Sequence, residues 1–155
     1  MDQEVAEEME GTMGVAAPES VRRRHRVLLV EDDPDARRTI VSTLKKACYA
    51  VTEAANADQA AILLNLNEPP PAISAIVCDI RTARIKGVEA AAYFRARYPH
   101  IPVIVTTTYP DIEWAITLMK RGVTDYLVKP LSRDDLLIVL KNALDRYVMV
   151  KRGSL

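Results

Sequence analysis

The feature that most constrains the fold is a regular alternation of short apolar runs with longer segments of helical periodicity. The apolar runs are expected to be strands at residues 27–30, 51–54, 75–78, 102–105 and 124–128. Short continuous runs of this kind are typical of strands buried on both faces. Five such units predict an α/β fold, a parallel sheet with helices on both faces. Right-handed crossovers favour the flavodoxin-like strand order 2-1-3-4-5.

Capping residues and prolines predict where the helices begin and end. Asp33, Asn56 and Ser132 stand just before helical segments, and their side chains suit the N-cap position. Gly87 is expected to open the helix after the third strand. Gly122 is expected to end the helix that begins near residue 111. The prolines at residues 69–71 break the second helix, because proline cannot continue a helix.

Length and composition predict one folded domain. The chain has 155 residues, of which 49% are hydrophobic, enough for one sizeable core. We expect a flexible arm at residues 1–25, the domain at residues 26–147 and a C-terminal tail at residues 148–155. His25 and His100 are expected to be exposed, and neither has a partner at metal-ligand spacing.

Charge and cysteine usage narrow the function classes. The 21 basic residues balance the 21 acidic ones, so we expect no direct binding of nucleic acid by the domain. Only two cysteines occur, which excludes a disulfide scaffold and suits a reducing compartment. No apolar stretch approaches the ~20 residues that span a bilayer, and the acidic N-terminus lacks a signal pattern. We therefore expect a cytoplasmic protein with no membrane contact.

Polar residues follow four of the five predicted strands. Glu31 and Asp32 follow the first strand, and Asp79 follows the third. Thr107 and Lys129 follow the fourth and fifth. The carboxyl ends of parallel strands share one edge of the sheet, and ligands bind there where the strand order reverses. We therefore expect these five side chains in one shallow pocket.

Three carboxylates in one pocket call for a compensating charge. At ~4 Å and an effective dielectric of ~20, each pair costs about 4 kcal/mol. Oxygen ligands without a suitably placed histidine favour Mg²⁺ over zinc. Lys129 and Thr107 suit the oxygens of a phosphoryl group. The combination predicts an aspartate that accepts a phosphoryl group.

Four motifs, each at a strand end, resemble the receiver domains of two-component response regulators (CheY-like). They are the acidic segment 29–34, the pair Cys78-Asp79 with Gly87 further on, the segment 105–107 and the segment 126–130 ending in Lys129-Pro130. The resemblance covers about residues 25–147. It is greatest to receivers of the NtrC type, which switch transcription through an attached ATPase.

The resemblance implies a role for each acidic residue. Asp79 is the expected phosphoacceptor, and the donor is a histidine kinase or phosphotransfer protein. Asp32, Asp79 and the backbone carbonyl of Arg81 are the expected Mg²⁺ ligands. Glu31 is expected to act on the metal largely through water. The domain itself is not expected to be an enzyme.

The resemblance also implies how phosphorylation is signalled. Lys129 pairs with Asp79 before phosphorylation, and Lys129-Pro130 forms a cis peptide. Thr107 and Lys129 each hold a phosphoryl oxygen afterwards, and Tyr126 is the switch aromatic that turns inward with Thr107. This repacks the face made by the fourth helix, the fifth strand and the fifth helix. A downstream output domain or protein, or a second copy of the chain, binds that face.

One loop departs from the family pattern and leaves alternatives open. Receivers usually have Met-Pro where this chain has Thr82 and Ala83, and the loop here is basic. A pseudo-receiver that binds partners without phosphorylation is therefore an alternative. A Mg²⁺-dependent phosphatase resembling haloacid dehalogenases is another. Such enzymes need an Asp-x-Asp pair after the first strand, whereas Glu31 and the acids after it lead directly into a helix.

Overall fold

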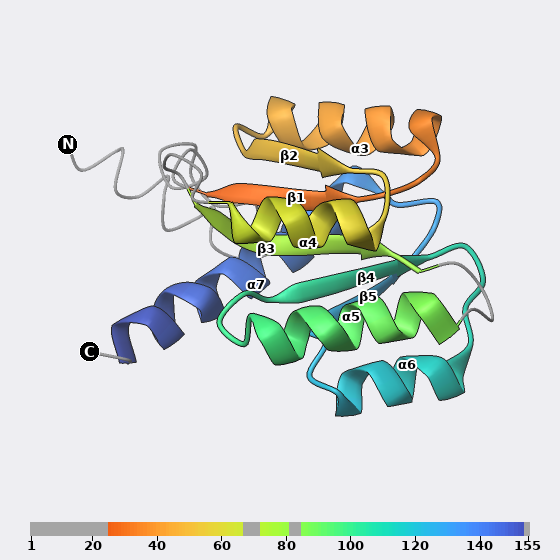
Figure 1. The fold of residues 1–155 in the computed structure, drawn as a ribbon. Coiled ribbons are helices and arrows are strands. Elements are labelled where there is room, and N and C mark those ends of the chain that lie inside the picture. The colour runs from red at the N-terminus through yellow and green to blue at the C-terminus, as the bar shows by residue number, and fades with distance from the viewer. Residues whose placement is uncertain (1–24, 67–71, 81–84, 154–155) are drawn as a thin grey trace.

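A parallel five-stranded sheet forms the middle layer of the structure (Figure 1). The computed structural model describes residues 25–66, 72–80 and 85–153. The strands run in the order β2-β1-β3-β4-β5 and all neighbours pair in parallel, as the sequence predicts. They are β1 (Arg26–Val30), β2 (Ala50–Ala54), β3 (Ile73–Asp79), β4 (Val103–Thr107) and β5 (Asp125–Val128).

Helices cover both faces of the sheet. They are α3 (Pro34–Lys46), α4 (Ala57–Asn65), α5 (Ile85–Arg97), α6 (Ile112–Lys120) and α7 (Arg133–Gly153). The helices α3 and α7 pack on one face, over Val27 and Leu29 of β1. The helices α4, α5 and α6 pack on the other, over Leu28 and Val30. Successive side chains of a strand point to opposite faces, so the continuous apolar run of β1 serves two cores.

Strand register brings the functional positions to one edge of the sheet. Val30 at the end of β1 pairs with Cys78 of β3, and Asp79 pairs with Thr106 of β4. Thr107 pairs with Val128 of β5. The arrowheads of β1, β3 and β4 point to the same side in Figure 1. The residues that follow these strands are therefore neighbours in space.

The expected caps are present. The side chains of Asp33, Asn56 and Ser132 each accept a hydrogen bond from a backbone N–H in the first turn of the next helix. Gly122 follows the C-cap of α6 with φ +93°, a conformation that a residue with a Cβ rarely adopts. Local sequence chemistry therefore determines where these helices begin and end.

The structure differs from the sequence-based expectations in three places. His25, expected to be exposed, is buried: it stands directly before β1, and its carbonyl accepts a hydrogen bond from the N–H of Ala50, so residue 25 belongs to the sheet and not to the arm. The helix α5 begins at Ile85, before the glycine expected to open it. The helix α7 continues to Gly153, so residues 148–153 of the expected tail are helical. Residues 1–24 of the expected arm lie outside the described residues.

Within the described ranges, no helix has the length and apolar character needed to cross a membrane.

Candidate functional site

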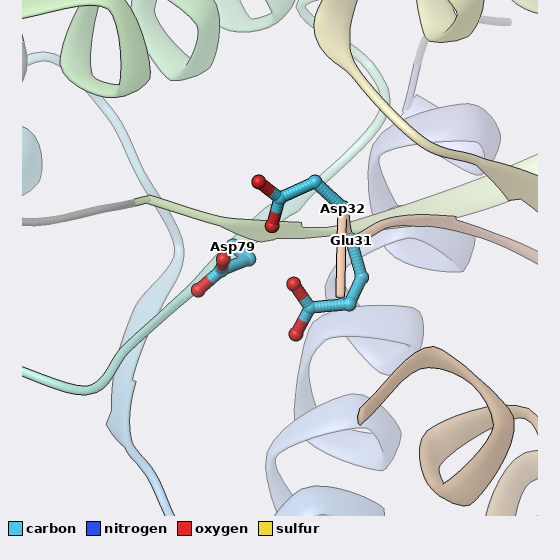
Figure 2. Close-up of side chains that lie close together, drawn as sticks. All are labelled: Glu31, Asp32 and Asp79. Atoms are coloured by element: carbon cyan, nitrogen blue, oxygen red, sulfur yellow. The ribbon is translucent and has the colours of Figure 1, made fainter. Parts of the chain in front are cut away.

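Three carboxylates converge where β1 and β3 end. Glu31 and Asp32 follow β1, and Asp79 is the last residue of β3. One carboxylate oxygen from each residue lies within 4.8 Å of the others. Figure 2 shows the three side chains turned toward a common space. The side chain of Glu31 is 1% exposed and that of Asp79 is 8% exposed, whereas Asp32 faces solvent.

Backbone contacts hold the start of the acidic pair. The N–H of Glu31 donates to the carbonyl of Ala54 at 3.0 Å, which extends the pairing of β1 with β2. The carbonyl of Glu31 accepts a hydrogen bond from Nη1 of Arg37 at 2.8 Å. Asp33 caps α3, so the chain turns into the helix directly after the pair. The carboxylates therefore stand on a firmly held strand end.

Lys129 joins two of the carboxylates. Its Nζ atom forms an ion pair with Oε1 of Glu31 and lies 3.1 Å from Oδ1 of Asp79. The backbone N–H of Lys129 donates to the carbonyl of Thr107 at 2.7 Å, which ties the end of β5 to β4. The bond between Lys129 and Pro130 is cis. One ammonium group is thus shared between two buried or nearly buried carboxylates.

The electrostatics of the cluster show an excess of negative charge. Burial raises the pKa of the Glu31 carboxyl, and the hydrogen bond from Lys129 only partly opposes this while Asp79 adds to it. Burial alone lowers the pKa of Lys129, but the hydrogen bond to Glu31 and the charge of Asp79 outweigh it and raise that pKa. Lys129 is therefore protonated at neutral pH, yet it does not fully balance the acids around it.

The residues present fit a divalent cation. The Oε2 atom of Glu31 is buried and has no hydrogen-bond partner among the residues that the structure describes. All donors of the cluster are carboxylate oxygens, which suit a hard cation such as Mg²⁺. A divalent charge beside Asp32 and Asp79 offsets the repulsion that one ammonium leaves. Arg81, the other expected ligand, lies outside the described residues.

Thr107 and Tyr126 contact the loop between β4 and α6. The hydroxyl of Thr107 is buried and accepts a hydrogen bond from the N–H of Tyr109 at 3.2 Å. Tyr126 is half-buried, and its hydroxyl accepts a hydrogen bond from the N–H of Asp111 at 3.4 Å. Asp111 is the N-cap of α6. The two side chains named as switch residues thus hold opposite ends of the same short loop.

The structure brings four of the expected site residues together: Glu31, Asp32, Asp79 and Lys129. Sequence reasoning missed the pairing of Lys129 with Glu31, because it assigned Glu31 to the metal. It also missed Arg37, which lies in the first turns of α3. One sequence signal could have pointed to Arg37. The N-cap at Asp33 starts the helix directly after the acidic pair, so the first turns of that helix lie close to the pair.

Comparisons with known proteins agree with this geometry. The family model of the response regulator receiver domain matches residues 27–141. An NtrX-like response regulator of Rickettsia felis is 37% identical over 119 residues, covering 76% of this chain and 24% of that protein. The transcriptional regulatory protein ZraR of Klebsiella oxytoca is 36% identical over 118 residues, covering 76% of this chain and 26% of that protein. The chain thus spans about a quarter of the length of these relatives.

Solved structures give the same fold. A CheY-like receiver domain protein from Methanospirillum hungatei JF-1 superposes with a TM-score of 0.72 at 26% identity, covering 81% of this chain and 97% of that chain. The receiver domain of NtrX from Brucella abortus superposes with a TM-score of 0.68 at 26% identity, covering 77% and 98%. These matches favour the receiver interpretation over the phosphatase alternative. The chain therefore belongs to the family of response regulator receiver domains, the signal-receiving modules of two-component systems.

Proposed function

We propose that Asp79 accepts a phosphoryl group from a phosphohistidine of a histidine kinase or phosphotransfer protein, with Mg²⁺ bound at the acidic cluster. The observation that carries the proposal is the placement of Lys129, whose Nζ atom lies 3.1 Å from Oδ1 of Asp79 and pairs with Glu31. A carboxylate, a fixed ammonium and further acidic ligands around one space are the parts that phosphoryl transfer to an aspartate requires.

The transfer is a displacement at phosphorus. A carboxylate oxygen of Asp79 attacks the phosphorus atom, and the bond between phosphorus and the imidazole nitrogen of the donor breaks. The electron pair of that bond leaves with the imidazole, and Asp79 becomes an acyl phosphate. Mg²⁺, when bound by Asp32, Asp79 and the carbonyl of Arg81, supplies positive charge that offsets repulsion between the acids and the phosphoryl oxygens.

Lys129 and Glu31 act together on the phosphoryl group. The ammonium of Lys129 donates to Asp79 before transfer and to a phosphoryl oxygen after it. Glu31 anchors this ammonium from a buried position, so the charge stays in place while its second partner changes. We therefore assign Glu31 chiefly to holding Lys129, beside the water-mediated role toward the metal that the resemblance implies.

Thr107 and Tyr126 connect the site to a binding face. When the Thr107 hydroxyl turns to a phosphoryl oxygen, it leaves the N–H of Tyr109 and releases the loop before α6. Tyr126 contacts the other end of that loop and moves inward. The large apolar side chains exposed on α6 and β5 nearby are Ile112, Ile116, Met119 and Val128. An output domain or protein, or a second copy of the chain, binds the face of α6, β5 and α7.

A phosphorylation assay tests the proposal. The purified chain is incubated with acetyl phosphate and Mg²⁺, and its intact mass is measured. We expect the addition of one phosphoryl group. No addition is expected when a chelator is present from the start and keeps Mg²⁺ from binding. The variant Asp79→Asn gains none, whereas Asp58→Asn, a change at an exposed acid on α4, gains it normally. A wild-type chain that stays unmodified with the metal bound overturns the proposal and favours the pseudo-receiver alternative.

A further inference from the structure

We infer that Arg37 is a positioning residue of the phosphorylation site, which it serves by holding the peptide unit between Glu31 and Asp32. The inference rests on the proposed function, because it assigns a task in metal binding at the same cluster. Arg37 stands on α3 and is bonded to the backbone of the acidic pair.

Two atoms of one guanidinium group contact the residue that follows β1 and a residue of β2. Nη1 of Arg37 donates to the carbonyl of Glu31 at 2.8 Å, and Nε lies 3.5 Å from Oε1 of Glu53 on β2. The planar guanidinium presents its donors in a fixed fork, so contact with Glu53 restricts the direction in which Nη1 points. The side chain of Arg37 is 23% exposed, less than a third of the exposure of Arg38 beside it at 74%.

The acceptor of this hydrogen bond lies between two acidic residues. The carbonyl of Glu31 belongs to the planar peptide unit that leads into Asp32, so fixing the oxygen also orients the Cα of Asp32. The N–H of Glu31 is already held by the carbonyl of Ala54 at 3.0 Å. Both peptide units of Glu31 are thereby tied to β2, one directly and one through Arg37 and Glu53.

Metal binding depends on this orientation. Mg²⁺ demands nearly ideal octahedral geometry at short distances, so a small displacement of Asp32 relative to Asp79 weakens the site. Asp32 is the exposed member of the cluster and follows Glu31 directly in the chain, so the peptide unit that Arg37 holds leads straight into it. Residues that orient the ligands of a metal without touching it typically change metal affinity 10–100-fold. Arg37 is such a residue for the acidic cluster.

The matched pair Arg37→Met and Arg38→Met tests the inference. Each change removes one positive charge from α3, but the ion pair that Arg38 forms within the described part of the chain is with exposed Asp35, away from the acidic cluster. We expect Arg37→Met to weaken Mg²⁺ binding about tenfold by titration calorimetry. We also expect the backbone amide of Glu31 to exchange with solvent faster in metal-free Arg37→Met than in the metal-free wild type. Arg38→Met leaves both measurements at their wild-type values, and equal results for the two variants overturn the inference.

The variant Arg37→Lys separates positioning from charge. A lysine keeps the positive charge, but one ammonium on a flexible stem lacks the fork that joins Glu31 to Glu53. We expect its Mg²⁺ affinity to fall nearly as far as in Arg37→Met. An affinity equal to wild type shows that only the charge matters and contradicts the positioning role.

The variant Glu53→Gln keeps the inference testable if Arg37→Met folds poorly. Glu53 is half exposed, and the change removes the negative charge that pairs with the guanidinium while keeping the shape of the side chain. We expect Glu53→Gln to lower the Mg²⁺ affinity about threefold. The double variant should bind Mg²⁺ as weakly as Arg37→Met alone, and no more weakly. Failure of the proposed function appears separately, as a wild-type chain that neither binds Mg²⁺ nor gains a phosphoryl group. If the wild-type chain binds Mg²⁺ and gains a phosphoryl group, and Arg37→Met binds Mg²⁺ equally well, then the proposed function stands and only the role of Arg37 is overturned.

Discussion

The Nζ atom of Lys129 lies 3.1 Å from Oδ1 of Asp79 and also forms an ion pair with Glu31. The three residues follow or end three different strands, and only the register of the sheet brings them together. A shared ammonium of this kind stabilises two carboxylates at once, and a change at any of the three affects the other two.

Removing the ammonium should destabilise the folded chain. In Lys129→Met, the buried carboxylate of Glu31 loses its ion-pair partner and stays close to Asp79. Breaking a buried pair from one side costs about 3–5 kcal/mol, and we expect about 2–4 kcal/mol here because Lys129 is 16% exposed. Urea unfolding without Mg²⁺ measures this loss. In the control Lys141→Met, which breaks a surface pair with Asp145, the change stays below about 1 kcal/mol.

Neutralising Asp32 should separate stability from metal binding. Asp32→Asn relieves repulsion within the cluster, so we expect about 1 kcal/mol of added stability without Mg²⁺. Mg²⁺ at about 100 times its Kd stabilises the wild type by about 2.7 kcal/mol through mass action, and it stabilises the variant far less. Thermal unfolding with and without Mg²⁺ gives both values. The control Asp33→Asn removes the neighbouring charge but keeps a good N-cap, so Mg²⁺ should stabilise it as much as the wild type. If Asp33→Asn loses as much of the Mg²⁺ stabilisation as Asp32→Asn, a ligand role for Asp32 is contradicted.

The switch can be followed by the single tryptophan. Trp114 lies in the first turn of α6, and Tyr126 packs against the same apolar cluster. We expect beryllofluoride with Mg²⁺ to change the Trp114 fluorescence of the wild type. Thr107→Val keeps a similar shape but lacks the hydroxyl, so the chain still gains a phosphoryl group while the fluorescence change is lost. Thr108→Val, at the exposed neighbouring position, keeps the change, and a full response in Thr107→Val contradicts the switch role.

The thiol of Cys78 should be inert in the folded chain. Burial, with the charges of Asp79 and Glu31, raises its pKa to about 12 from an ordinary value of 9.0. As the pH rises above 9.0, the unfolded chain releases this proton before the folded chain does, so the free energy of unfolding falls between about pH 9 and pH 12. Cys78→Ala should show a flatter alkaline profile over that range.

A thiol reagent checks the same environment at neutral pH. We expect it to label Cys48, which is partly exposed, in the native chain and to label Cys78 only after unfolding. Rapid labelling of both thiols in the native state contradicts the buried, acidic surroundings of Cys78.

The sequence was sufficient to predict the order of the strands and most helix boundaries. Strands buried on both faces carry continuous apolar runs, and caps such as Asp33 act within one turn, so both signals are local. The exposure of His25 was predicted wrongly: the residue is buried and its carbonyl accepts a hydrogen bond from Ala50, a contact across the sheet that no local pattern reports. The end of α7 was also missed, since no capping signal follows residue 147 before Gly153.

The sequence predicts which residues form the site better than it predicts the contacts between their side chains. Parallel strands align their carboxyl ends, so Glu31, Asp32, Asp79 and Lys129 could be grouped from sequence. Which carboxylate the ammonium of Lys129 pairs with depends on side-chain directions, and these follow from tertiary packing. The hydrogen bond from Arg37 to the backbone of Glu31 has the same origin. The cap at Asp33 places Arg37 early in the helix after the acidic pair, but neither spacing nor composition indicates which atoms Arg37 and Lys129 contact.

The central claim is that the acidic cluster holds Mg²⁺ so that Asp79 receives a phosphoryl group beside Lys129. A crystal structure of the chain with Mg²⁺ and beryllofluoride, which mimics the phosphoryl group, tests it most directly. The account predicts beryllofluoride bonded to a carboxylate oxygen of Asp79, Mg²⁺ on Asp32 and Asp79, and the ammonium of Lys129 on a fluorine atom while still paired with Glu31. Crystals that diffract well and show neither group beside Asp79 at saturating concentrations would contradict it.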